Sequence, residues 1–178
     1  MTSGLALPEN GRQQLMGWKG RARLEKFYAD DDINLRDPRN PYGRRIATPY
    51  ETIEADNLLL TAGATYALGR LTSDSAAKLD ATTGRMCVGD GGTAVSASQV
   101  DLQGTNKFRK VFDGVPTVSG NTLQAVTTFL TSEANFTWAE AGLANSASGA
   151  TLVNRFLQAF GTKTGSLQWI LTISITLT

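Results

Sequence analysis

Leu167-Gln-Trp-Ile-Leu-Thr-Ile-Ser-Ile-Thr-Leu177 is the stretch of sequence that decides the fold. Apolar side chains alternate here with polar ones, and only Ile170 interrupts the alternation. Successive side chains of a strand point to opposite faces, so the pattern predicts a strand with one face in a core and the other at a surface. A strand this apolar needs a neighbour on both edges, or a partner subunit on one, because a bare edge invites aggregation.

Other β-type segments precede this strand, with turn residues between them. We expect them at 22–28, 50–54, 85–88, 107–112, 122–130, 136–140 and 151–160, with a turn region at 115–121. Gly142 is expected to end the segment at 136–140. Closely spaced turns with a single helix predict a mainly-β fold, a jelly-roll-like β-sandwich with one short helix and an extended N-terminal arm.

The helix is expected after the segment at 50–54. Asp56 or Asn57 can cap it, since a side-chain oxygen there can accept from free backbone N–H groups. Gly63 and Gly69 weaken the helix but permit close packing on a sheet. The apolar stripe consists of Leu60, Ala64, Ala67, Leu68 and Leu71. The predicted core residues are Leu60, Leu68, Trp138, Trp169, Leu171, Ile173 and Ile175.

Residues 1–50 differ in composition from the rest of the chain, and we predict an assembly arm at 1–50 and a β-sandwich domain at 51–178. The stretch 30–45 has little to bury, and its prolines exclude a helix. The basic residues could contact nucleic acid, but the acidic residues among them favour an acidic neighbouring subunit. The assembly candidates are Arg12, Trp18, Arg21, Arg23, Arg36, Arg39, Arg44 and Arg45.

Residues 114–178 carry very few charges. Glu133, Glu140, Arg155 and Lys163 are the only ones, whereas about a quarter of the residues in a typical globular domain are charged. Either Thr, Ser and Asn cover the surface of this half, or other subunits do. The composition leaves both readings open.

The sequence offers little catalytic chemistry. It contains no histidine, which excludes Ser-His-Asp and Cys-His catalysis and zinc sites that use histidine ligands. Its lone cysteine, Cys87, is expected to be a buried thiol. A glycosidase-like acid pair of Glu133 and Glu140 is an alternative, although nothing in the sequence fixes their separation. We therefore expect no enzymatic activity.

Two further motifs resemble binding sites only superficially. Asp30-Asp-Asp32 lacks the spacing of a calcium loop and is expected to be a solvated acidic turn. Val88-Gly-Asp-Gly-Gly-Thr93 lacks the glycine spacing and the Gly-Lys-Ser/Thr ending of phosphate-binding loops, so it predicts a tight glycine turn. No metal or cofactor is expected.

The formal net charge of +1 provides no field that would draw the chain to nucleic acid or to a membrane. No window of 18 apolar residues predicts a membrane-spanning helix, and residues 1–8 lack the pattern of a signal peptide. We expect folding in a host cytoplasm.

Three segments, in order, carry a family resemblance. They are Val88-Gly-Asp-Gly-Gly-Thr-Ala94, Thr131-Ser-Glu-Ala-Asn-Phe-Thr-Trp-Ala-Glu-Ala-Gly-Leu143 and the terminal alternating strand, preceded by Asn57-Leu-Leu-Leu60 and its Ala/Gly-rich helix. The set, over residues 55–178, resembles small structural proteins of tailed bacteriophages, of the tail-fibre, collar or minor structural type. Ala144 stands where that pattern has Phe, and residues 1–50 are not part of it.

The resemblance implies a virion location without catalysis. A structural protein of the neck or tail is expected, such as a collar, fibre-anchor or tail-decorating protein. The alternatives are a capsid decoration or cement protein and a receptor- or carbohydrate-binding module. Expected partners are other virion proteins, namely portal or neck, tail or capsid subunits, and further copies of the chain. Nucleic acid and membranes are not expected as partners.

Overall fold

Nine strands and one helix make up the part of the chain that the computed structural model describes, residues 17–31, 47–71, 78–147 and 151–178. The elements are β1 (Trp18–Tyr28), β2 (Glu51–Leu59), α1 (Thr61–Gly69), β3 (Arg85–Gly89), β4 (Lys107–Val111), β5 (Thr117–Ser119), β6 (Thr122–Phe129), β7 (Thr137–Ala144), β8 (Leu152–Thr162) and β9 (Leu167–Leu177). The predicted mainly-β class is confirmed.

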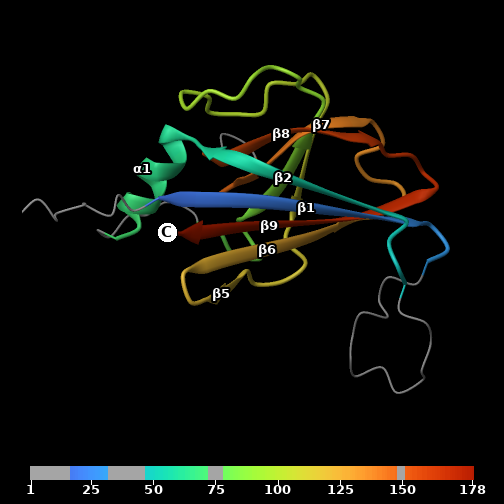
Figure 1. Ribbon diagram of the computed structural model, residues 1–178, viewed down its shortest axis with the longest axis horizontal. Coiled ribbons are helices and arrows are strands. Elements are labelled where there is room, and N and C mark those ends of the chain that lie inside the picture. Colours follow the sequence, from blue (N-terminus) through green and yellow to red (C-terminus); the bar gives the residue numbers. More distant parts are fainter. Residues whose placement is uncertain (1–16, 32–46, 72–77, 148–150) are drawn as a thin grey trace, which may run out of the picture.

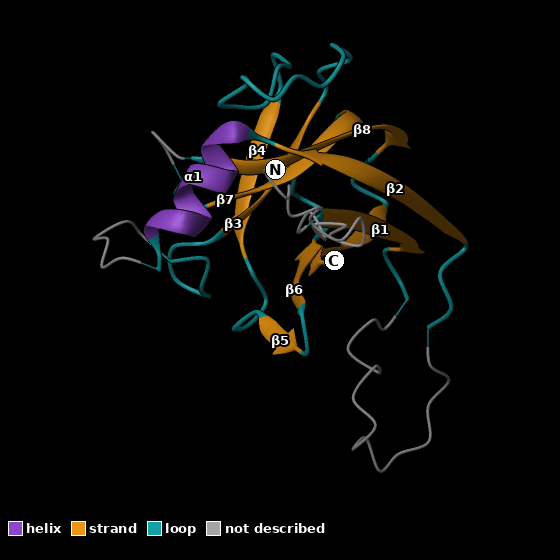
Figure 2. Cartoon of the chain, turned by 60° about the vertical axis from the view of Figure 1, so that its left-hand side comes forward, coloured by secondary structure: helices purple, strands orange, loops and turns teal. Residues whose placement is uncertain are grey.

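The strands form one antiparallel sheet in the order β4-β3-β7-β8-β2-β1-β9-β6-β5, and the sheet curls around its core (Figures 1 and 2). β2 joins the two halves of the sheet. Its residues 51–56 pair with β1, and its residues 57–59 pair with β8. The two halves of the predicted sandwich are therefore continuous through one strand, with the core between them.

β9 has a neighbour on both edges, as its alternating sequence requires, with β1 along its whole length and β6 along residues 169–176. It pairs with β1 from Trp18↔Leu177 to Tyr28↔Leu167, and with β6 from Thr122↔Thr176 to Phe129↔Trp169. Leu171 and Ile173 are fully buried. The strand predicted from 167 to 177 thus has the predicted limits and the predicted inner face.

The predicted boundary between arm and domain at residue 50 is wrong. β1 lies inside the sheet between β2 and β9, and its Ala22, Leu24 and Phe27 are fully buried. Lys19, Arg21 and Arg23 of this strand are exposed, whereas Glu25 and Lys26 are buried, and many other charged residues of 1–50 lie outside the described residues. The prediction failed because it relied on the average composition of residues 1–50, which does not reveal the single central strand among them.

The predicted start of the helix is also wrong. β2 continues to Leu59, so Asp56 and Asn57 lie in a strand, and α1 begins after Leu60 without a side-chain cap. α1 packs on β8 through Gly63, where a Cβ atom would lie 2.0 Å from the Val153 carbonyl oxygen. This close approach is the packing role that the helix glycines predicted.

Two other predictions fail for related reasons. Leu68, assigned to the core, is 65% exposed, because α1 rests on the sheet through Gly63 rather than through its leucine stripe. Gly142 does not end its strand, since β7 runs on to Ala144. There a glycine is needed because a Cβ atom would lie 2.3 Å from the Asn154 carbonyl oxygen of β8.

The centre of the core is aromatic. Trp138 packs edge to face against Phe129 and Trp169, with ring centroids 4.8 and 4.7 Å apart. The indole nitrogen of Trp138 donates to the Ala134 carbonyl at 2.8 Å. The other predicted core residues, Leu60 and Ile175, are also buried.

Candidate functional site

An apolar cavity lies at one end of the molecule. This end holds α1, the β5–β6 turn, the start of β1 and the end of β9 (Figure 1). The cavity, called the apolar pocket below, has a volume of about 400 Å³, within the usual range of ligand pockets. Its lining includes Trp18, Tyr66, Leu79, Val118, Leu123, Val153, Ile175 and Leu177.

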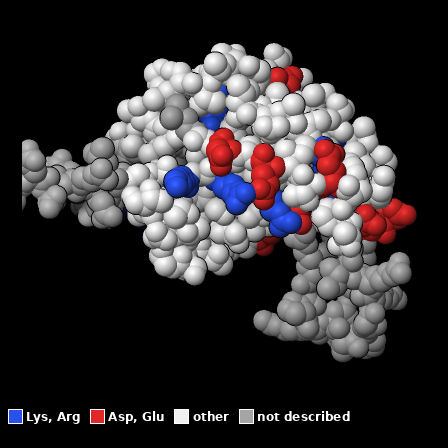
Figure 3. Space-filling model, viewed as in Figure 1, with Lys and Arg blue, Asp and Glu red and all other residues white. Residues whose placement is uncertain are grey.

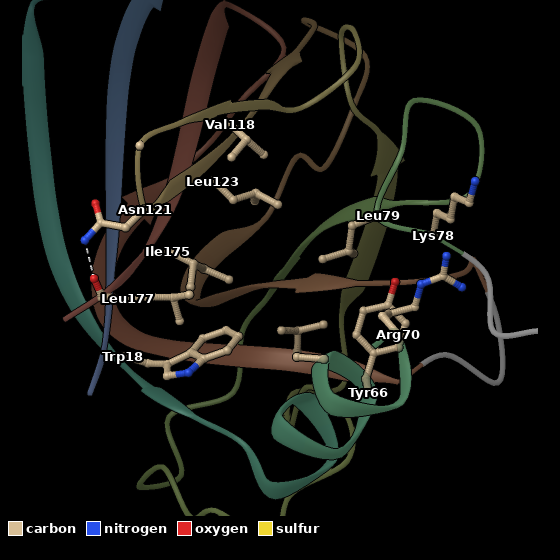
Figure 4. A pocket seen from close by; sticks show the side chains of 13 residues that line it. Trp18, Tyr66, Arg70, Lys78, Leu79, Val118, Asn121, Leu123, Ile175 and Leu177 are labelled. Carbon is tan, nitrogen blue, oxygen red and sulfur yellow. Dashed lines mark hydrogen bonds between the residues drawn. The ribbon is translucent and has the colours of Figure 1, made fainter. Parts of the chain in front are cut away.

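The charged side chains of the apolar pocket are both cationic. Arg70 and Lys78 lie together on the side facing Trp18 and Leu177 (Figure 4). The described lining contains no Asp or Glu. Opposite them the Asn121 amide donates to the Leu177 carbonyl oxygen, which ties the β5–β6 turn to β9. The apolar pocket therefore suits an apolar group that carries a negative charge at one end.

The elements around the apolar pocket expose further large apolar side chains. Leu71, just past α1, is 80% exposed, and Val115 and Val118, before and within β5, are 76% and 71% exposed. Leu68 of α1 is also 65% exposed. The parts of the chain that form the apolar pocket thus carry further exposed apolar side chains, and clusters of such side chains mark interaction surfaces in soluble proteins.

A second site is entirely internal and joins the glycine loop at 89–104 to the sheet. Glu140 of β7 and Arg155 of β8 are both fully buried, and Arg155 Nε donates to Glu140 Oε2 at 2.5 Å. The same carboxylate accepts from the backbone N–H groups of Gly91, Gln103 and Gly104 at 3.2, 2.9 and 2.7 Å. A buried charge is tolerated only when it is paired and hydrogen-bonded in this way.

Arg155 fastens the other side of the loop. Its guanidinium donates to the carbonyl oxygens of Thr93 and Gly91 at 2.9 and 3.3 Å, and to the Gln99 side chain at 3.2 Å. A Cβ atom on Gly91 would lie 2.5 Å from a Glu140 oxygen. Gly89 and Gly91 of the Val-Gly-Asp-Gly-Gly motif thus leave room for a carboxylate of the protein itself.

The alternative of a Glu133–Glu140 acid pair is not supported by the geometry. Glu133 belongs to a different network, in which it accepts from Lys110 Nζ at 2.5 Å and from the Leu130 N–H at 2.8 Å. Glu140 has no exposed surface from which to reach a substrate.

Lys163 is the fourth charged residue of the C-terminal half and is 1% exposed. Its ammonium donates to the Leu130 carbonyl at 2.6 Å and to the Asn135 side chain at 3.0 Å. Burial lowers the pKa of Lys163 to about 8. Since Glu140, Arg155 and Lys163 are internal and the Glu133 side chain is only 23% exposed, the outer surface formed by residues 114–178 carries almost no side-chain charge.

The arginines predicted for assembly are only partly brought together. Arg21 and Arg23 lie on the outer face of β1, where Arg21 bonds to Glu54 and Arg23 lies 3.4 Å from Glu25. Blue and red side chains form a mixed band there (Figure 3). These cations have acidic neighbours, so they form no basic patch. Arg12, Arg36, Arg39, Arg44 and Arg45 lie outside the described residues.

The remaining predicted candidates have ordinary structural environments. Burial raises the pKa of the Cys87 thiol to about 12, which keeps it protonated. Asp31 accepts from the Tyr28 N–H, and Asp32 lies outside the described residues.

The described part of the chain contains no group of three or more acidic or cysteine side chains arranged to hold a metal ion. It also contains no helix with the length and hydrophobicity to span a membrane.

No family model matches the chain, and neither a curated protein nor a solved structure is similar to it. The arguments about function therefore rest on the geometry and on the sequence alone.

Sequence reasoning missed both sites. The Glu140–Arg155 pair had one signal, since each of these charges lies in a segment of otherwise uncharged strand residues. The apolar pocket had none, because its lining comes from six separate parts of the chain. Trp18 was singled out beforehand, but as part of a basic arm rather than as the wall of a cavity.

Proposed function

We propose that this protein is a non-enzymatic structural subunit of a tailed-phage virion, located at the neck or tail. In this role it contacts neighbouring subunits and further copies of itself through the end that holds the apolar pocket and through the uncharged surface of its C-terminal half. The polar groups able to do acid–base chemistry serve instead to hold the fold together.

The observation that carries this proposal is the position of the charges in residues 114–178. Three of the four lie inside the molecule, although a solvated surface is usually rich in charged side chains. The cores of protein interfaces, in contrast, are depleted in charged residues, because burying an unpaired charge is costly. A surface without charge thus suits contact with other subunits.

The sheet edges are also relevant to assembly. One edge strand, β4, carries Lys107, Arg109 and Lys110, and charges of this kind oppose edge-to-edge pairing. The other, β5, has only three residues and is exposed. Association through the β5 end, beside the apolar pocket, is therefore favoured over association through β4.

A carbohydrate-binding role has less support. Sugar rings stack on exposed aromatic faces, but Trp138 is fully buried and Trp169 is 1% exposed. Trp18 does line a cavity, but most of the residues that line it with Trp18 are apolar, and its polar side chains are Tyr66, Arg70, Lys78 and Asn121.

A reconstruction of the intact particle tests the proposal. We expect density that fits the nine-stranded sheet at the neck or tail, with about a dozen copies or fewer. Hundreds of copies on the shell would assign the protein to capsid decoration instead. Failure to find the chain in purified particles, by density and by mass spectrometry, would contradict a virion role altogether.

A further inference from the structure

We propose that the apolar pocket receives residues 5–9, Leu-Ala-Leu-Pro-Glu, of a second copy of this chain. The inference rests on the proposed function and names the contact through which copies associate. Three independent features of the molecule support it: the chemistry of the pocket, the sequence of the segment and the place where the chain enters the fold.

The lining of the apolar pocket favours a ligand with an apolar group followed by an anion. Its walls are aliphatic and aromatic, and its only charged lining residues, among those described, are the cations Arg70 and Lys78 (Figure 4). Such a cavity buries apolar side chains favourably, and a carboxylate beside Lys78 adds a charge-assisted contact.

Residues 5–9 have this composition in this order. Leu5 and Leu7 provide apolar side chains, and Glu9 follows two residues after Leu7. Glu9 is the only acidic residue before Gly17, so within residues 1–16 no other segment combines leucines with an adjacent carboxylate.

The chain also enters the fold at the correct end. Gly17 and Thr178 exchange backbone hydrogen bonds of 2.6 and 2.7 Å beside Trp18, which lines the apolar pocket. β1 therefore begins at the end of the molecule that holds the apolar pocket. Leu7 lies ten positions before Gly17, a reach of roughly 33 Å when extended, which suffices to reach the same end of an adjacent copy.

Cysteine cross-linking of full-length chains tests the contact. One chain carries Leu7→Cys and the other Val118→Cys, at the edge of the apolar pocket. The matched control is Val115→Cys, which is equally exposed but does not line it. Cys87 is buried and stays protonated, so it should not form disulfides with the introduced cysteines. The two chains are mixed, oxidised and separated without reductant, and a size tag on one chain identifies mixed dimers.

We expect the Leu7→Cys and Val118→Cys mixture to form at least fivefold more mixed dimer than the Leu7→Cys and Val115→Cys mixture. Adding Glu9→Lys should reduce this yield, and Lys78→Glu on the other chain should restore it. Equal yields at 118 and 115 would overturn the proposal. So would a double variant, Leu7→Cys with Val118→Cys, that forms only an intramolecular disulfide, since the segment would then occupy the pocket of its own chain.

The same preparations separate this inference from the proposed function. If sedimentation shows that the chain self-associates while 118 and 115 cross-link equally, the contact is wrong but assembly through another surface stands. If the wild-type chain stays monomeric and is missing from particles, the structural role itself fails.

Discussion

The Glu140–Arg155 site and the apolar pocket differ in almost every physical respect. The first is buried, charged and fully hydrogen-bonded, and it holds a glycine loop against β7 and β8. The second is open, largely apolar and flanked by exposed leucine and valine side chains. The buried ion pair is thus sealed from solvent, and the apolar pocket offers mainly hydrophobic contact. This contrast favours a protein that associates over one that transforms a substrate.

The largest effect is expected when a charge is placed in the core rather than at the pocket. Leu171→Asp puts a carboxylate at a fully buried position without a partner and should prevent folding. Val118→Asp puts the same group at an exposed position and should leave the fold intact. Circular dichroism and heteronuclear NMR of the two variants check this. A folded, soluble Leu171→Asp protein would mean that the inner face of β9 is misassigned.

A smaller but still large effect is expected at the internal ion pair. Glu140→Gln leaves the Arg155 guanidinium buried without its counter-charge, which costs about 3–5 kcal/mol of unfolding free energy. The control is Glu133→Gln, whose partly exposed pair with Lys110 should contribute about 1 kcal/mol or less. Urea unfolding measures both. Similar losses at the two sites would show that the buried pair does not anchor the loop.

The seating of α1, which forms one wall of the apolar pocket, depends on Gly63. Gly63→Ala should cost about 1–3 kcal/mol of unfolding free energy, because the new Cβ atom would meet the Val153 carbonyl oxygen and lift the helix from β8. Gly92→Ala is the control, since no atom lies within 4 Å of its Cβ position. Thermal unfolding compares the two, and a neutral Gly63→Ala would contradict the close packing.

The smallest effect concerns pH and the buried Lys163. Its pKa is lowered from 10.5 to about 8 in the folded protein, so between these values the unfolded chain binds more protons than the folded one. Lys163 should therefore make the protein more stable as the pH rises from about 8 to 10.5. Comparison of wild type with Lys163→Met over this range isolates the effect, with the exposed Lys19→Met as control. A wild-type advantage that does not grow with pH would refute the lowered pKa.

Local patterns in the sequence predicted the parts of the fold that local physics controls. The alternation from Leu167 to Leu177 gave β9 its limits and its buried face, since period-two burial needs no distant information. The start of α1 was wrong because Asp56 and Asn57 have strong capping propensity but are held in β2 by pairing with β1 and β8. Tertiary pairing here overrides local preference.

The candidate sites were harder to predict because they depend on contacts distant in sequence. Gly91, Gln103 and Gly104 reach Glu140 across 36 to 49 positions, and no spacing rule links them. The glycine motif was predicted as a tight turn, and two of its glycines, Gly89 and Gly91, make room for the Glu140 carboxylate. The predicted arm was too long because it included β1. The outer face of β1 carries Lys19, Arg21 and Arg23, and these charges made the average composition of residues 1–50 look unlike that of a buried strand.

The central claim is that the end of the molecule with the apolar pocket exists to bind other chains. Because β1 begins at Trp18, a deletion through residue 45 would destroy the sheet, and the correct comparison is between the full-length chain and residues 17–178. Sedimentation velocity over a range of concentrations makes that comparison. We predict that the full-length chain forms oligomers and that the shortened chain sediments as a folded monomer. A full-length chain that remains a monomer at every concentration, or a shortened chain that associates equally well, would contradict the account.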